Sequence, residues 1–158
     1  MLLTEINSLL LTNISMVIII GVILSLLFTE ITGVLPAGLV VPGYLALHMK
    51  LPQVIFATFI ISILTYLIVY FGVSKVTILY GKRKFAAMVV VAIVLQFIMR
   101  IILPFDYGHI SGLDAVGIVV PGLLANTIQR QGLAATFLST GMMIALTYGC
   151  AILLNIKI

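Results

Sequence analysis

The sequence has very few charged residues for its length. Of 158 residues, 8 are Lys or Arg and 4 are Asp or Glu, which is 8% charged, whereas soluble domains normally carry about 25%. Tryptophan is absent, and the single cysteine, Cys150, excludes a disulfide within the chain. Because 63% of the residues are hydrophobic and the mean hydropathy is +1.38, we expect an integral membrane protein and not a soluble domain.

Long uncharged runs predict the membrane-spanning helices. The three longest, at 6–29, 51–74 and 131–156, exceed the roughly 20 residues that a helix needs to cross a bilayer. The first run lacks a preceding basic residue and a cleavage pattern, so we expect a retained helix and not a signal peptide. We predict an all-α polytopic membrane protein, a single integral membrane domain over 1–158, with full spans at about 9–28, 54–72, 85–103 and 133–154.

Two copies of one short segment form an internal repeat. The windows 31–46 and 110–125, offset by 79 residues, share nine of sixteen residues, including GLVVPG in one and GIVVPG in the other. We therefore predict two repeats of the same order: a helix, a Pro-Gly segment and a second helix. Repeat one covers about 9–73, repeat two about 85–155, and a basic connection at 74–84 joins them.

Each Pro-Gly segment is predicted to be a broken helix. Proline removes a backbone donor and clashes with the preceding turn, and the following glycine permits close approach of another backbone. Pro42 with Gly43 and Pro121 with Gly122 occupy the same place in the two copies. Paired interrupted segments are typical of binding sites in repeated membrane proteins. The two segments therefore form either a polar passage or a tightly packed helix seam.

Two topologies fit this pattern. If each Pro-Gly segment is re-entrant, the repeats are parallel and the chain has four full spans. If each segment crosses, the repeats are inverted and have three spans each. The positive-inside rule does not decide, because both topologies place five Lys and Arg residues inside and three outside. We favour crossing segments, since an odd number of spans per repeat generates an inverted repeat.

Half of the basic residues lie in one connection. They are Lys75, Lys82, Arg83 and Lys84. The positive-inside rule accounts for such a cluster, and a second interpretation is that it docks a cytosolic partner. A cluster this local is not the extended basic face of a nucleic-acid-binding protein, so no nucleic-acid partner is expected.

Polar residues at the borders of the Pro-Gly segments are candidates for function. A charge at membrane depth is a functional hypothesis by default, although Glu30 and Asp114 can also mark helix ends. After the second segment, a cation and two carboxamides can bind carboxylates through charge-assisted hydrogen bonds, or they form a simple polar loop. The candidate residues for the passage or seam are Glu30, Pro42, Gly43, Asp114, Pro121, Gly122, Asn126, Gln129 and Arg130.

Three stretches resemble the PgsC/CapC family, the membrane subunit of bacterial poly-γ-glutamate synthetase in capsule biosynthesis. They are FTEITGVLPAGLVVPGYLAL at 28–47, FGVSKVTILYGKRKFAA at 71–87 and GIVVPGLLANTIQRQG at 117–132. The resemblance covers most of the chain from residue 15 onward. It implies a multi-pass protein of the bacterial cytoplasmic (inner) membrane.

The resemblance also implies partners. These are a separate ATP-dependent amide ligase, PgsB/CapB, which is similar to Mur ligases, and an anchored subunit, PgsA/CapA, that acts on export or attachment of the polymer. ATP and a divalent metal are expected on the ligase, and no cofactor, metal site or catalytic residue is expected in this chain. We expect the basic cluster to dock the ligase, and the chain to assemble as an oligomer because one copy is small for a polymer pore.

The residues themselves agree with a noncatalytic subunit. Gly81-Lys82 looks like the tail of a phosphate-binding loop, but Val76 stands where the first glycine belongs and Arg83 where Ser or Thr belongs. Two alternatives remain open: a stand-alone secondary transporter of a small anion, and a purely structural membrane anchor for the ligase.

Overall fold

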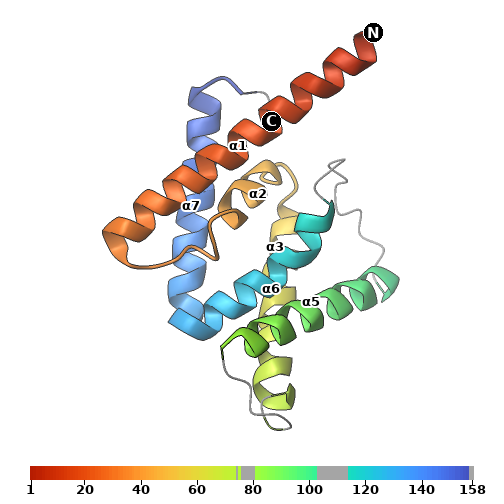
Figure 1. Ribbon diagram of the computed structural model, residues 1–158, viewed down its shortest axis with the longest axis vertical. Coiled ribbons are helices and arrows are strands. Elements are labelled where there is room, and N and C mark those ends of the chain that lie inside the picture. The colour runs from red at the N-terminus through yellow and green to blue at the C-terminus, as the bar shows by residue number, and fades with distance from the viewer. Residues whose placement is uncertain (74, 76–80, 103–113, 157–158) are drawn as a thin grey trace. The chain divides into compact units, whose positions relative to one another are not determined.

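The computed structural model describes residues 1–73, 75, 81–102 and 114–156, and the regular structure of these residues is helical throughout (Figure 1). The all-α prediction is therefore confirmed for this part of the chain. The elements are α1 (Leu2–Thr32), α2 (Val41–Leu47), α3 (Pro52–Ile68), the π-helix η1 (Val69–Val73), α5 (Lys82–Ile102), α6 (Asp114–Gln131) and α7 (Leu133–Leu153).

Four helices are long and apolar enough to cross a membrane: α1, α3 with its continuation to Gly72, α5 and α7. At about 1.5 Å per residue, a helix of the length of α5 extends roughly 31 Å, which matches a hydrocarbon core of about 30 Å. The 7 residues of α2 extend only about 10 Å and cannot cross as a helix. The four predicted spans are present, whereas crossing Pro-Gly segments and inverted repeats stay predictions.

The described chain divides into two compact units. Unit 1 comprises Met1–Lys50 and Phe137–Ile158, and unit 2 comprises Leu51–Thr136. Each unit thus contains the first helix and the Pro-Gly segment of one predicted repeat with the closing helix of the other: α1, α2 and most of α7 in unit 1, and α5, α6 and α3 in unit 2. The helices that close the two repeats are exchanged between the units.

In unit 1 the first Pro-Gly segment is broken, as predicted. Helix α1 ends at Gly33, whose positive φ of 70° favours glycine and whose N–H donates to the Thr29 carbonyl at 2.8 Å. After a bent stretch, Pro42 lies in the first turn of α2, where its missing N–H costs no helical hydrogen bond. All seven residues of α2 are buried.

Glycine lets the backbones of α1 and α2 touch. A Cβ added to Gly21 would lie 2.6 Å from the Gly43 Cα, and one added to Gly43 would lie 3.0 Å from the Ile18 Cα. Thr147 of α7 packs at the same contact, because a Cβ added to Gly21 would lie 3.4 Å from the Thr147 Cγ2. Lipid tails are as apolar as the helices, so no hydrophobic force drives membrane helices to associate. Small residues at a helix crossing let the backbones approach and gain dispersion contacts instead.

In unit 2 the second Pro-Gly segment makes the same kind of contact with α5. A Cβ added to Gly122 would lie 2.9 Å from the Val89 Cα and 3.3 Å from both the Met88 carbonyl oxygen and the Ala92 Cβ. Helix α3 packs against both α5 and α6. Its buried stripe carries hydroxyls that bond to its own backbone, as Thr58 does to the Val54 carbonyl and Thr65 to the Ile61 carbonyl, each at 2.7 Å.

The prediction of a broken second segment is wrong. Helix α6 runs without interruption from Asp114 to Gln131 with Pro121 inside it. Pro121 cannot donate to the carbonyl four residues earlier, but the Gln96 Nε2 of α5 donates to that Gly117 carbonyl at 3.4 Å. A neighbouring helix therefore supplies the donor that the proline removes, which keeps α6 continuous.

We predict that Gly122→Ala destabilises the protein by about 1–3 kcal/mol, because the added Cβ must push the α5 backbone away. Gly141→Ala is the matched control: Gly141 is exposed on α7, and none of the described neighbours lies within 4 Å of its added Cβ. The control is expected to be neutral or stabilising by up to about 1 kcal/mol. Equilibrium unfolding in detergent micelles measures both, and equal effects would contradict the backbone contact at Gly122.

A double-mutant cycle tests whether the Gln96 side chain replaces the backbone N–H donor that Pro121 lacks. Gln96→Met is expected to cost about 1 kcal/mol because it leaves the partly buried Gly117 carbonyl unpaired. In a Pro121→Ala background the restored N–H can bond to Gly117, so Gln96→Met is expected to be neutral there. Unfolding free energies of the four proteins give a coupling of about 1 kcal/mol. Additive effects would show that Gln96 does not serve Pro121.

Candidate functional site

An open pocket of about 580 Å³ lies in unit 2, where α5 begins and α6 ends. Its described lining combines cations, carboxamides and one aromatic ring, and none of these residues is acidic. Gly81, Lys82, Lys84 and Phe85 line it from the α5 side, and Asn126, Gln129 and Arg130 from α6.

The pocket forms because α5 and α6 run antiparallel. Gly122 of α6 meets Met88 to Ala92 of α5, and Gly117 meets Gln96, so residue numbers fall along α6 as they rise along α5. The end of α6 consequently faces the start of α5. Gly81 directs the chain into α5 with a positive φ of 58°, and its carbonyl accepts the Phe85 N–H at 3.4 Å.

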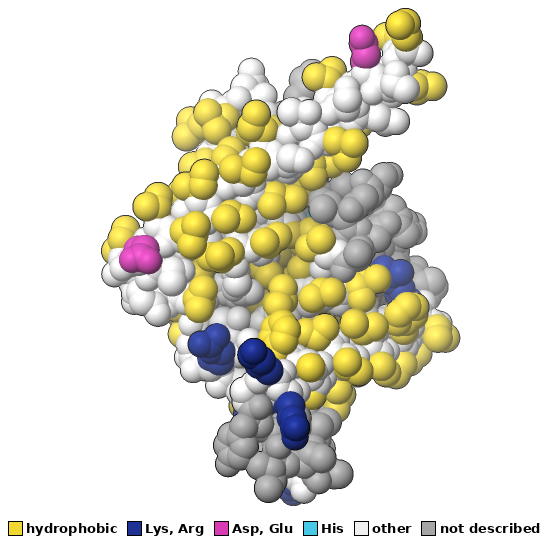
Figure 2. Space-filling model, viewed as in Figure 1, with side chains coloured by type: hydrophobic (Ala, Val, Ile, Leu, Met, Phe, Trp, Pro, Cys, Tyr) yellow, Lys and Arg dark blue, Asp and Glu magenta, His cyan; other side chains and the backbone are white. Residues whose placement is uncertain are grey.

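The electrostatics of the pocket favour an anion. Lys82 and Arg130 are exposed and Lys84 is half-buried, so three positive charges surround one opening. The first N–H groups of α5 have no partner within the helix, and the positive end of its dipole lies at the same place. In Figure 2 several Lys and Arg side chains gather next to the region where α5 begins. An anionic ligand would pair with these groups through charge-assisted hydrogen bonds.

Two carboxamides accompany the cations. Asn126 and Gln129 are half-buried, and the Gln129 Oε1 is buried without a hydrogen-bond partner among the described residues. A buried acceptor without a donor costs free energy.

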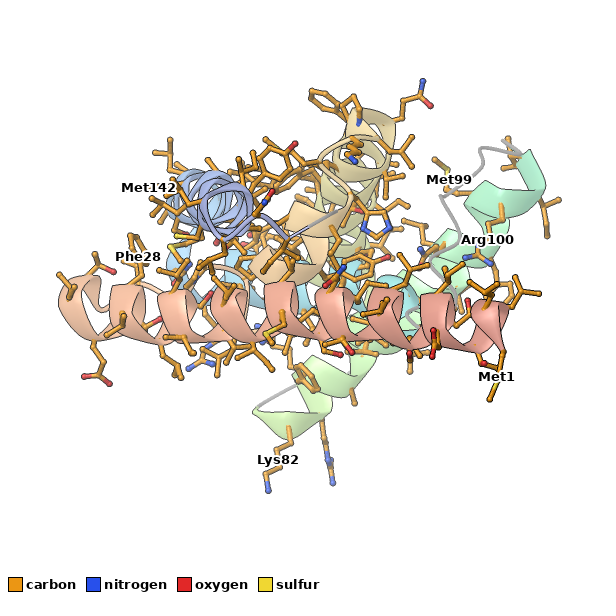
Figure 3. All side chains as sticks on the ribbon, turned by 90° about the horizontal axis from the view of Figure 1, so that it is seen from above. Met1, Phe28, Lys82, Met99, Arg100 and Met142 are labelled. Carbon is orange, nitrogen blue, oxygen red and sulfur yellow. The ribbon has the colours of Figure 1, made fainter. Side chains whose placement is uncertain are left out.

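The remaining basic residues of the cluster lie outside the pocket lining. Arg83 and Lys75 are exposed. Figure 3 shows Lys82 at the start of α5, turned away from the helix, and Arg100 towards the opposite end of the same helix. The cluster thus splits into residues that line the pocket, Lys82 and Lys84, and residues available to a partner on the surface.

The other predicted site residues do not join the pocket. Glu30 is exposed in the last turn of α1, in unit 1. Pro42 and Gly43 are buried in the α1–α2 contact, and Pro121 and Gly122 in the α5–α6 contact. Asp114 begins α6, but its side chain lies outside the described residues. The polar-loop interpretation of Asn126, Gln129 and Arg130 is wrong, because all three belong to the last turns of α6.

Sequence reasoning missed three residues of this region. Gly81 and Phe85 line the pocket, and Gln96 supports the α6 backbone. Gln96 is an uncharged polar residue inside a predicted span, and that alone marks a candidate because polar groups in membrane helices require partners. The structure brings together no group of three or more His, Cys, Asp or Glu that could hold a metal within the described ranges.

Comparison with known proteins agrees with the resemblance stated above. The family model described as "Capsule biosynthesis CapC" matches residues 20–137. The chain is 50% identical over 131 residues to "PGA biosynthesis protein CapC" of Bacillus subtilis (strain 168). It is 49% identical over 134 residues to "Capsule biosynthesis protein CapC" of Bacillus anthracis. Each alignment covers 83% of this chain and 88% of the relative. No solved structure matches. The chain therefore belongs to the capsule-biosynthesis CapC family.

Proposed function

We propose that this chain is the membrane subunit of a bacterial poly-γ-glutamate synthesis and export complex. In this role it recruits a separate ATP-dependent amide ligase and guides the polyanionic product at the cytoplasmic membrane. The name of the Bacillus subtilis relative, a PGA biosynthesis protein, supports the assignment. The observation that carries it is the pocket at the start of α5, where Lys82, Lys84 and Arg130 surround one opening.

The pocket suits capture of the product. A polymer that carries a carboxylate on every monomer presents a row of negative charges. Three cations around one opening can neutralise neighbouring carboxylates together. Such a pocket at the end of a spanning helix stays in contact with water, which avoids the high cost of a charge inside the hydrocarbon core. The product would therefore be held at the membrane surface.

The exposed cations outside the pocket, Lys75 and Arg83, are proposed to dock the ligase. Complementary surface charge speeds the encounter of two proteins and orients them. The ligase would bind ATP and a divalent metal and would form the amide bonds, and an anchored PgsA/CapA-like subunit would act on export or attachment. This chain would contribute binding and placement and no reacting group.

Charge substitutions at two places are predicted to separate the two roles. Lys84→Gln/Arg130→Gln is expected to leave ligase recruitment intact and to lower polymer yield about tenfold, because two of three charge-assisted contacts are lost. Lys75→Gln/Arg83→Gln removes the same net charge outside the pocket and is expected to weaken recruitment. Co-purification of the ligase with the chain and the amount of cell-surface polymer measure the two roles, at matched membrane abundance of each variant.

Two outcomes would contradict the proposal. If both double variants retained full recruitment and full yield, neither the pocket nor the surface cations would serve the complex. If a ligase fused to an unrelated membrane helix made and exported polymer at the normal rate, the chain would be an anchor only. Uptake of a small anion by the purified chain in liposomes, without partners, would instead establish the transporter alternative.

A further inference from the structure

The first turns of α1 have no packing partner in the part of the chain that the structure describes. Residues 1–12 are all exposed, and the buried stripe of α1 begins only at Val17. Figure 3 shows α1 as one uninterrupted helix that carries both Met1 and Phe28, so these turns continue the direction of the membrane span. They also precede residue 20, where the match to the family model begins. They are therefore a separate surface of this chain, outside the region that the family model covers.

Residues 3–16 follow the heptad pattern of a coiled coil. Four residues spaced alternately by three and four positions share one face of the helix. They are Leu3, Ile6, Leu10 and Asn13, and we call them the α1 ridge. The opposite face carries four hydroxyls, each of which donates to a carbonyl three or four residues earlier. They are Thr4, Ser8, Thr12 and Ser15. The hydroxyl face thus needs no other partner, whereas the α1 ridge offers an apolar surface that contains one carboxamide.

Asn13 is the polar member of the α1 ridge. Its side chain is half-buried and makes no hydrogen bond within the described ranges. It falls inside the span predicted at about 9–28, where an amide without a partner costs free energy. Asn side chains in membrane helices form hydrogen bonds between helices and thereby drive their association. Asn13 therefore calls for a second helix at its own depth.

The outer turns of the α1 ridge lie in water. The 31 residues of α1 extend about 46 Å at 1.5 Å per residue, which is roughly 16 Å more than a hydrocarbon core of about 30 Å. Because the span begins near Leu9, the turns before it project from the bilayer, where Leu3 is 78% and Ile6 is 48% exposed. Apolar surface in water favours burial. The face that carries Asn13 inside the membrane thus also needs a cover outside it.

We propose that two copies of this chain pair through the α1 ridge as a parallel two-stranded coiled coil. Copies of one membrane protein share one orientation in the bilayer, so their α1 helices run parallel and a two-fold contact places each ridge residue beside its own counterpart. A carboxamide is both donor and acceptor, so the two Asn13 side chains satisfy each other. Outside the bilayer, Leu3 and Ile6 of one copy cover those of the other.

The charges of α1 favour a second copy over other occupants. The positions that flank the α1 ridge are uncharged, so identical helices do not repel each other. They are Asn7, Leu9, Ile14 and Met16. Glu5, the one charged side chain before residue 30, belongs to the hydroxyl face. A lipid chain offers Asn13 no hydrogen bond, and a soluble protein does not reach it within the bilayer. This pairing does not depend on the proposed function of the pocket.

Cysteine cross-linking tests which face of α1 pairs. Single cysteines are introduced into the full-length chain in a Cys150→Ser background. The ridge variants are Leu3→Cys and Leu10→Cys, and the controls on the hydroxyl face are Ser8→Cys and Thr12→Cys. Native membranes that contain the chain without the ligase are then oxidised. Ridge cysteines are expected to form a linked dimer, because facing positions of a parallel pair lie within reach of a disulfide, and control cysteines are expected to stay monomeric.

Substitution of Asn13 tests the contact inside the membrane. Asn13→Leu is expected to weaken dimerisation about fivefold, which is the effect of one hydrogen bond between membrane helices. Asn13→Gln keeps the carboxamide and is expected to dimerise like the unmodified chain, as is the control Thr12→Val on the hydroxyl face. Energy transfer between labelled chains in liposomes, at several protein-to-lipid ratios, measures the dimer fraction. Circular dichroism confirms that each variant keeps its helices.

The outcomes that contradict the pairing are specific. Ridge cysteines that stay monomeric would overturn it and would identify a helix of another protein as the partner of the α1 ridge. Equal cross-linking of ridge and control cysteines would show random collision and would also overturn it. Undiminished dimerisation of Asn13→Leu would overturn the role of the carboxamide pair. Neither ligase nor polymer is present in these experiments, so each of these failures would leave the proposed function untouched.

Discussion

Backbone contact at glycine is the constraint on which both compact units depend. In each unit the glycine that follows the proline, Gly43 or Gly122, lies so close to a neighbouring helix that an added Cβ would meet the Cα of Ile18 or Val89 at 3.0 or 2.9 Å. Lipid provides no hydrophobic drive for helices to associate, so such contacts supply the dispersion energy. In unit 2 this contact also fixes the register of α5 against α6, and the register brings Arg130 beside Lys84.

The same Pro-Gly pair produces two different local structures, and the difference lies in the surroundings of the proline. Pro42 lies in the first turn of α2, where no helical carbonyl requires the N–H that proline lacks. Pro121 falls inside α6, where the Gly117 carbonyl needs a donor, and Gln96 of α5 provides one. A proline inside a membrane helix is thus tolerated when a neighbouring helix satisfies the carbonyl that it leaves unpaired.

Much of this fold could be predicted from the sequence, and the remainder depends on tertiary contacts. The three long uncharged runs and the shorter apolar run that ends at Arg100 predicted the four spans, and the Pro-Gly pairs predicted close packing as one of two interpretations. The continuity of α6 could not be predicted, because it depends on Gln96, a residue 25 positions before Pro121. Lys82 and Arg130 were separate candidates in the sequence. Their place around one pocket could not be predicted, because it depends on the antiparallel pairing of α5 and α6. Glu30 was chosen for its position beside a Pro-Gly segment, and its exposure at the end of α1 fits a helix boundary equally well.

The tight contact between α5 and α6 would limit the path of a polymer bound as proposed. The pocket opens at one end of the helix pair, while Gly122 brings the two backbones into contact directly beyond it. Interiors packed this closely have low compressibility, so a polymer bound as proposed could not continue between α5 and α6 while these two backbones stay in contact. Such a polymer would instead follow another face of unit 2 or a surface that a partner or a further copy of the chain provides. The pocket is consequently better suited to hold and orient a polyanion at the membrane surface than to form the pore itself.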